Sequence, residues 1–145
     1  FILQLALCMP ILQIARLVDE HDTRLWRIIE KHVNQAKANA NYSGVRHVGV
    51  DETATKRGHN YVTLFVDMDQ TQVIHVTEGK DAATVKDFKD SLQYHHAQPS
   101  QITDVCADMS PAFRKGIQEC FPSARLTFDK FHVIKLVNEA IDKVT

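Results

Sequence analysis

Residues 48–52 read Val48-Gly49-Val50-Asp51-Glu52, a short apolar run that ends in carboxylates. A second run of the same form is Val105-Cys106-Ala107-Asp108. If the two runs are neighbouring strands of one sheet, Asp51 and Asp108 lie one strand spacing apart, roughly 5 Å. Two carboxylates at that separation can share a divalent cation, because Mg²⁺ prefers hard oxygen ligands. The pair therefore indicates metal-dependent phosphoryl transfer on nucleic acid.

The chain around Asp51 has the alternating pattern of an antiparallel meander. Strands are predicted at residues 47–52, 61–66 and 72–77, where apolar and polar side chains alternate. Turn residues separate them, at 57–59 after the first strand and at 67–70 after the second. Within the first strand, Glu52 points to the face opposite Asp51.

The spacing of the apolar residues then changes from the alternation typical of strands to the three- and four-residue spacing typical of helices. Asp81 is placed to cap a helix that runs to about Tyr94, and Pro111 suits the first turn of another, which ends before Pro122. Further strands are predicted at residues 102–107 and 125–128, and a last helix over residues 131–144. The order β-β-β-α-β-α-β-α predicts an α/β fold of the ribonuclease H-like kind, with a mixed five-stranded sheet. A Rossmann fold is excluded, because the early crossover helix and Gly-rich first turn are missing.

The first 38 residues have helical periodicity with a short polar break at residues 21–23. Two helices joined by a three-residue turn form the helix-turn-helix pattern, in which the second helix would present Arg24, Arg27 and Lys31 to DNA. A small helical packing module explains the pattern equally well. The polar residues 39–46 are predicted to be a linker. The predicted organisation is therefore a helical segment at 1–38, a linker at 39–46 and a catalytic domain at 47–145.

The composition limits the class of protein but does not indicate its substrate. The 145 residues are 44% hydrophobic and 24% charged, with a net charge of −1, which is ordinary globular composition. No segment is basic enough to indicate nucleic-acid binding by charge alone. The three cysteines lack a Cys-x-x-Cys spacing, which argues against a zinc ribbon or disulfide scaffold and fits a reduced cytoplasmic compartment. No run approaches the ~20 apolar residues of a membrane span.

Other acidic side chains compete with Asp51 and Asp108 for a functional role. Asp67 and Asp69 fall in a predicted hairpin turn and are interpreted as solvated turn residues. Asp104 can share a face with Asp108 but lies too far back along its strand. Asp129 ends the fifth strand near the edge where Asp108 lies.

Polar and basic side chains around these strands are further candidates. His132 can reach a phosphate, although spacing alone favours a helix cap for Asp129 and a surface imidazole for His132. Lys56, Arg57 and Lys130 are candidates for contacts with DNA phosphates, although a solvated face is the commoner role for such residues.

Four ordered blocks resemble the transposases of bacterial insertion sequences of the ISL-three family. The blocks are residues 49–52, 56–61, 108–113 and 128–135, and the resemblance runs from about Val45 to the C-terminus. It implies a DDE-type transposase with a ribonuclease H-like fold that uses Mg²⁺ or Mn²⁺. Asp51 matches the first catalytic aspartate and Asp108 the second, while Asp129 to His132 is similar to an Asp/Cys-x-x-His signature of several DDE families.

The resemblance also implies a third catalytic residue, a glutamate beyond a helical insertion. Glu139 comes too early to be assigned to it. The chain begins with Phe1 and ends within a helical pattern, so it is expected to be a fragment that is inactive alone. The full-length protein would nick DNA at element ends and join it to target DNA, as a homo-oligomer in the bacterial cytoplasm, associated with the nucleoid. A catalytically inert DNA-binding remnant and an unrelated ribonuclease H-like nuclease remain alternatives.

Overall fold

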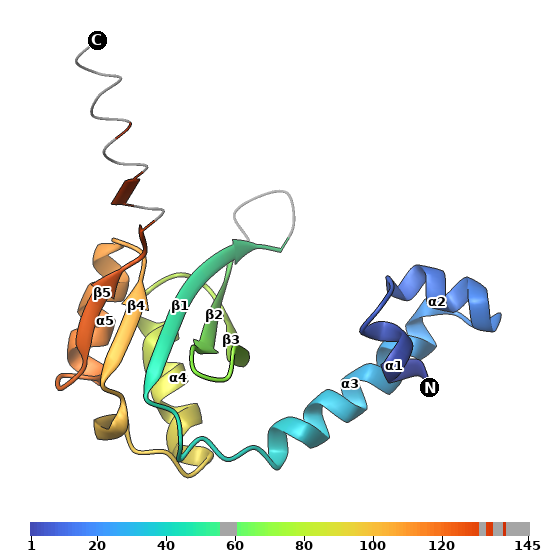
Figure 1. Ribbon diagram of the computed structural model, residues 1–145, viewed down its shortest axis with the longest axis horizontal. Helices are drawn as coiled ribbons and strands as arrows, with labels where there is room; N and C mark the ends of the chain where they lie inside the picture. Colours follow the sequence, from blue (N-terminus) through green and yellow to red (C-terminus); the bar gives the residue numbers. More distant parts are fainter. Residues whose placement is uncertain (56–60, 131–132, 135–137, 139–145) are drawn as a thin grey trace. The chain divides into compact units, whose positions relative to one another are not determined.

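The computed structural model describes residues 1–55, 61–130, 133, 134 and 138. It divides into two compact units, residues 1–40 and residues 41–145 (Figure 1). The helix predicted over residues 131–144 falls largely outside the described residues. At its start, the backbone N–H of Val133 donates to the carbonyl of Asp129 at 3.2 Å. No helix among the described residues is long and apolar enough to cross a membrane.

The first unit consists of helices packed around a small apolar core. They are α1 (Ile2–Ala6), α2 (Ile11–Val18) and α3 (Asp22–Ala38). Ile14 and Ala15 of α2 and Leu25 of α3 are buried, and apolar side chains from α1 and α2 pack partly buried around them. Asp19 adopts the left-handed conformation and ends α2, which lets the chain turn into α3 within three residues. The two helical segments predicted on either side of residues 21–23 are therefore present.

The second unit holds a mixed sheet, whose described strands follow the order β3-β2-β1-β4-β5 (Figure 1). β1 is central, pairing antiparallel with β2 and parallel with β4, while β5 runs parallel to β4. This order and orientation confirm the predicted ribonuclease H-like arrangement. The strands are β1 (His47–Ala54), β2 (Tyr61–Asp67), β3 (Gln72–Glu78), β4 (Asp104–Ala107) and β5 (Arg125–Phe128).

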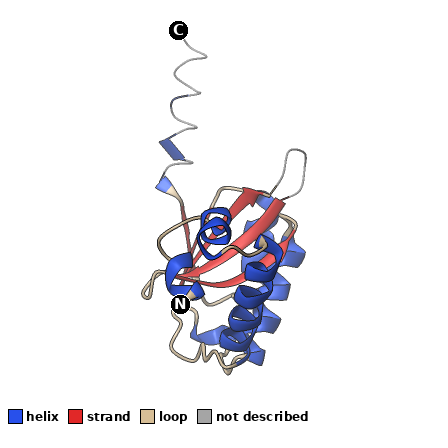
Figure 2. Ribbon diagram, turned by 90° about the vertical axis from the view of Figure 1, so that its right-hand side faces the viewer, coloured by secondary structure: helices blue, strands red, loops and turns tan. Residues whose placement is uncertain are grey.

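Helices α4 (Ala82–Tyr94) and α5 (Pro111–Cys120) pack against each other beside the sheet (Figures 1 and 2). α4 begins where predicted, because the Asp81 carboxylate accepts hydrogen bonds from the N–H groups of Ala83 and Thr84 at 3.0 and 3.4 Å. α5 begins at Pro111, which needs no hydrogen-bond partner for its nitrogen in the first turn. A short 3₁₀ helix, η1 (Pro99–Gln101), precedes β4.

The main core lies between these helices and one face of the sheet. The rings of Phe65 on β2 and Phe88 on α4 stack with centroids 4.2 Å apart, and both side chains are fully buried. Val48 and Val50 on β1, and Val105 and Ala107 on β4, are buried on the same side. Successive side chains alternate along a strand, so the residues between them project from the opposite face. We call that opposite side the outer face.

The second half of the predicted linker is bound to the sheet unit. Tyr42 and Val45 are buried, and the Tyr42 hydroxyl donates to the carbonyl of Ile74 at 2.9 Å. The side-chain amide of Gln101 donates to the carbonyls of Tyr42, Ser43 and Val45 at 2.9, 3.0 and 2.9 Å. Residues 42–45 are therefore held by hydrogen bonds from a residue more than fifty positions away.

Truncating Phe88 to alanine should lower the free energy of unfolding by about 3–5 kcal/mol, because it removes the ring that fills the core between α4 and β2. Tyr94→Ala in the same helix is the matched control. Its side chain is 76% exposed, and the change should stay within about 0.5 kcal/mol. Urea unfolding followed by circular dichroism measures both variants, and equal losses would contradict this description of the core.

Candidate active site

The pairing of β1 with β4 brings together the two segments that carry the predicted catalytic aspartates. In the parallel pairing of β1 with β4, His47 lies opposite Asp104, and Gly49 lies opposite Cys106. Asp51 and Asp108 each come two residues after this last pair, Asp51 within β1 and Asp108 just after the end of β4. Neighbouring strands are about 4.8 Å apart, and a site shared by the two carboxylates stays a prediction of this register.

Asp129 falls on the same line across the sheet. β5 continues the register on the far side of β4, with Ala107 opposite Phe128. One residue further, the backbone N–H of Asp129 donates to the carbonyl of Ala107 at 3.0 Å. Three aspartates therefore follow one line across three adjacent parallel strands, and we call them the carboxylate row: Asp51 within β1, Asp108 just after β4 and Asp129 just after β5.

The carboxylate row lies on the outer face of the sheet. Val50 directly precedes Asp51 in β1 and is buried on the inner side, so Asp51 projects the other way. Asp108 follows the buried Ala107 where β4 ends. Asp51 is exposed, while Asp108 and Asp129 are half-buried. The row is thus open to a large substrate.

Local hydrogen bonds orient the two carboxylates of the predicted pair. Oδ1 of Asp51 accepts the N–H of Glu52 at 2.8 Å, and Oδ1 of Asp108 accepts the N–H of Ser110 at 2.7 Å. The second bond is an Asx turn that leads the chain from β4 into α5. Each aspartate thereby has one oxygen fixed by the backbone, and within the described part of the chain its other oxygen is left for a ligand.

These residues fit part of a metal site. Asp51 and Asp108 offer the hard oxygen ligands that Mg²⁺ and Mn²⁺ prefer. Within the described part of the chain, no group of three or more His, Cys, Asp or Glu side chains is arranged to hold a metal ion. The pair can therefore supply two ligands, and a complete coordination shell needs donors from elsewhere.

The basic residues predicted to contact DNA are only partly described. Arg24, Arg27 and Lys31 are exposed on α3 in the first unit, and the Arg24 guanidinium pairs with Glu20 at 2.6 Å. Lys130 is exposed beside Asp129 at the end of β5. The other predicted residues, Lys56, Arg57 and His132, lie outside the described residues.

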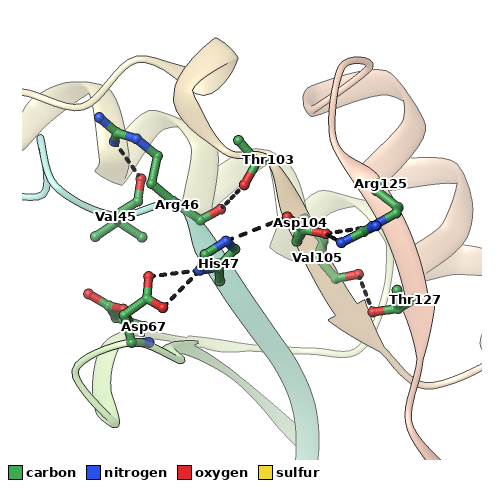
Figure 3. Close-up of polar contacts among 10 residues, drawn as sticks. Val45, Arg46, His47, Asp67, Thr103, Asp104, Val105, Arg125 and Thr127 are labelled. Carbon is green, nitrogen blue, oxygen red and sulfur yellow. Dashed lines mark hydrogen bonds and ion pairs between the residues drawn. The ribbon is translucent and has the colours of Figure 1, made fainter.

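A second polar row, which the sequence did not predict, lies at the amino ends of the same strands (Figure 3). His47 Nδ1 lies 2.8 and 2.9 Å from the two carboxylate oxygens of Asp69, and its Nε2 lies 3.6 Å from Asp104. The Nε of Arg125 donates to the other oxygen of Asp104 at 2.7 Å. No local signal marks these contacts, because each joins residues about twenty or more positions apart.

The prediction for Asp67 needs correction here, whereas Asp69 lies exposed in the turn as predicted. The carboxylate of Asp69 also pairs with His47. Asp67 is buried, and its Oδ1 accepts the N–H groups of Asp69 and Gln70 at 2.9 and 3.2 Å. It stabilises the β2–β3 turn from inside, because its carboxylate replaces solvent as the acceptor for the turn amides.

Contacts within the second row shift the pKa values of His47 and Asp104. The hydrogen bond to Asp69 raises the pKa of His47, and the negative charge of Asp104 raises it further. Hydrogen bonds from Thr103 and from Arg125 lower the pKa of Asp104. Both directions favour the charged forms, so the contacts of the row are strongest when an imidazolium and a guanidinium face the two carboxylates.

Comparison with known proteins decides the family. A family model described as "Transposase", of the DDE type found in ISL3 insertion sequences, matches residues 48–145. This chain belongs to that transposase family. The transposase for insertion sequence element IS1557 of Mycobacterium tuberculosis is 34% identical over 119 residues, which is 82% of this chain. The transposase for IS1001 of Bordetella parapertussis is 35% identical over 104 residues, or 71% of this chain.

In both comparisons the match spans 25% of the relative's own length, so the chain corresponds to about a quarter of an ISL3-type transposase. Among solved structures, the catalytic core domain of BIV integrase gives a TM-score of 0.40 at 13% identity, covering 60% of this chain and 56% of that one. A simian T-cell lymphotropic virus intasome gives 0.42 at 16% identity, covering 74% and 43%. The strand order, rather than these likenesses, identifies the ribonuclease H-like fold of the transposase chain.

The Asx turn of Asp108 predicts different costs for two substitutions. Asp108→Ala removes the acceptor for the Ser110 N–H and should lower the free energy of unfolding by about 1 kcal/mol. Asp108→Asn keeps a side-chain oxygen acceptor and should change it by less than about 0.5 kcal/mol. Urea unfolding tests both. A cost for asparagine as large as that for alanine would show that charge, rather than the turn, stabilises this position.

Proposed function

We propose that Asp51 and Asp108 are metal-ligating catalytic residues of a transposase that cleaves DNA strands and transfers them during transposition. The observation that carries the proposal is the parallel pairing of β1 with β4, since both aspartates come two residues after its last pair, Gly49 with Cys106. Membership of the transposase family supports it. The metal would be Mg²⁺ or Mn²⁺, and it would stabilise negative charge on the attacking and leaving oxygens of a phosphodiester.

The residues of this chain have separable roles in the proposal. One oxygen each of Asp51 and Asp108 is fixed by a backbone amide, which presents the other oxygen in a defined direction. Asp129 lies beside Asp108 on β5, where it would orient the metal ligands or the substrate phosphate. His132 is proposed for the same task by its similarity to the family signature. A further carboxylate, outside the described residues, would complete the ligand set.

DNA is the proposed partner of both units. Arg27 and Lys31 on α3 would contact phosphates, and Arg24 would join them by exchanging Glu20 for a phosphate. Lys130, and the undescribed Lys56 and Arg57, would contact DNA near the carboxylate row. The whole protein would act as a homo-oligomer on element ends and target DNA, in the cytoplasm and associated with the nucleoid.

A catalytically inert DNA-binding remnant is the second candidate. The incomplete metal-ligand set among the described residues favours it for this chain. We accordingly expect no strand cleavage by the chain alone. A plasmid-nicking assay with Mn²⁺ tests this, and robust nicking that is lost in Asp51→Ala would show that the site is already complete.

Calorimetric titration with Mn²⁺ tests the metal site itself. The unaltered chain should bind Mn²⁺ weakly, because two carboxylates provide only part of a coordination shell. Asp51→Asn and Asp108→Asn should each abolish the binding. Asp90→Asn, which neutralises an exposed carboxylate on α4, is the matched control and should leave it unchanged. Equal binding by all variants would contradict a shared site at Asp51 and Asp108.

Salt-dependent DNA binding tests the role of α3. Arg27→Gln and Lys31→Gln should each reduce the slope of log affinity against log salt concentration by about 1, because each loses one phosphate contact. Lys115→Gln on α5 removes the same charge from the sheet unit and should leave the slope unchanged. Fluorescence anisotropy with a labelled duplex measures the slopes. If the α3 variants and the control behave alike, the helical unit is a packing module instead.

A further inference from the structure

The outer face carries two polar rows on the same three strands. Residues His47, Asp104 and Arg125 lie opposite one another in register across β1, β4 and β5. The carboxylate row lies four residues further along each strand, about 13 Å away at the usual rise per residue. Any shift of one strand against its neighbour would therefore move both rows together.

The second row is joined by direct contacts as well as by register. Both ring nitrogens of His47 face carboxylates, with Nδ1 at 2.8 Å from Asp69 and Nε2 at 3.6 Å from Asp104. A neutral imidazole has one N–H, so only the imidazolium can direct a proton toward both partners. Arg125 binds the opposite oxygen of Asp104. The contacts thus link β1 to β4 and the β2–β3 turn, and β4 to β5.

The pairing that places the proposed metal ligands is short. β1 and β4 share only three register pairs, from His47–Asp104 to Gly49–Cys106, and β5 has four residues. A slip of one residue would turn Asp108 to the opposite face of the sheet. A slip of two would carry it about 6.6 Å along the strand. Either shift would separate the carboxylates of Asp51 and Asp108.

We propose that His47, Asp69, Asp104 and Arg125 form a charged clamp, which holds Asp51 and Asp108 in register and acts only while His47 is protonated. The clamp residues are positioning residues, because each lies four residues or more from the proposed metal ligands. This inference rests on the proposed metal-binding role of Asp51 and Asp108. It adds a pH-dependent control of that site.

The surroundings of His47 fix the direction of the pH effect. Its pKa is raised, first by the hydrogen bond to Asp69. The clamp is therefore complete below the ordinary histidine value of about 6.5 and is lost as the pH rises through the raised value. Asp104 stays ionised throughout, since Thr103 and Arg125 lower its pKa. The titratable and charged groups near His47 are Asp67, Asp69, Asp104, Cys106 and Arg125.

The test compares Mn²⁺ affinity across pH 6 to 8.5 for His47→Gln, Asp104→Asn and the double variant. At pH 6 each single variant should bind roughly two- to fivefold more weakly than the unaltered chain, the range expected for exposed ion pairs. The double variant should lose less than the sum of the two single losses, because both changes remove the contact between His47 and Asp104, while each also removes a contact of its own. Lys115→Gln breaks an exposed pair with Glu119, 4.0 Å away on α5, and is the matched control.

The pH profile separates positioning from a general loss of stability. Affinity of the unaltered chain should fall as His47 loses its proton, and the imidazole resonances of His47 in NMR should titrate over the same range. Asp69→Asn should move both transitions to lower pH, while His47→Gln should remove the fall altogether. Unfolding in urea at each pH verifies that every variant is folded.

The outcomes distinguish the clamp from the proposed function. Additive losses in the double variant, or the same pH profile in His47→Gln as in the unaltered chain, would overturn the clamp while leaving the metal site standing. His47 could titrate as expected from its contact with Asp69 while the chain binds no Mn²⁺ at any pH. That result would overturn the proposed metal site, and the positioning role of the clamp with it. Non-additive losses of Mn²⁺ affinity in the double variant, together with an affinity that falls as the pH rises, support both the clamp and the metal site.

Discussion

The parallel pairing of β1 with β4 is the contact on which the proposed site depends. It joins residues 57 positions apart in the chain, and its three register pairs determine where every later residue of both strands lies. Asp51 and Asp108 are unrelated in sequence, and only this pairing makes them neighbours. The connection between the two strands includes the crossover helix α4, as a parallel pairing requires.

The two faces of the sheet have different tasks. The inner face is apolar, and Phe65, Phe88 and Phe113 fill the layer between the sheet and the two helices. Burial of these side chains provides most of the stabilisation, as apolar area removed from water does in small domains. The outer face carries charges at both ends of the parallel strands, one row proposed to hold metal and the other proposed to hold register. The residues that stabilise the fold and the residues proposed for metal binding thus lie on opposite faces of the sheet.

Local sequence signals predicted the elements well, because each signal acts within a few residues. Asp81 caps α4, Pro111 opens α5, and the strands predicted before Asp51 and Asp108 are present, although β1 continues to Ala54. Contacts set by tertiary structure could not be read in this way. His47 and Asp104 meet only through the strand register, and Gln101 reaches residues 42–45 only after β4 packs beside β1. Asp67 resembled a solvated turn residue because nothing local shows that its turn is covered.

The most direct test of the account is where Mn²⁺ binds. In NMR spectra of the labelled chain, the paramagnetic ion broadens amide signals according to their distance from it. If Asp51 and Asp108 hold the metal, substoichiometric Mn²⁺ should first remove the signals of Glu52, Met109 and Ser110, which flank the two aspartates. Signals at the other end of the strands, such as those of His47 and Asp104, should persist. Broadening that begins there, or spreads evenly over the acidic surface, would contradict a metal site at Asp51 and Asp108.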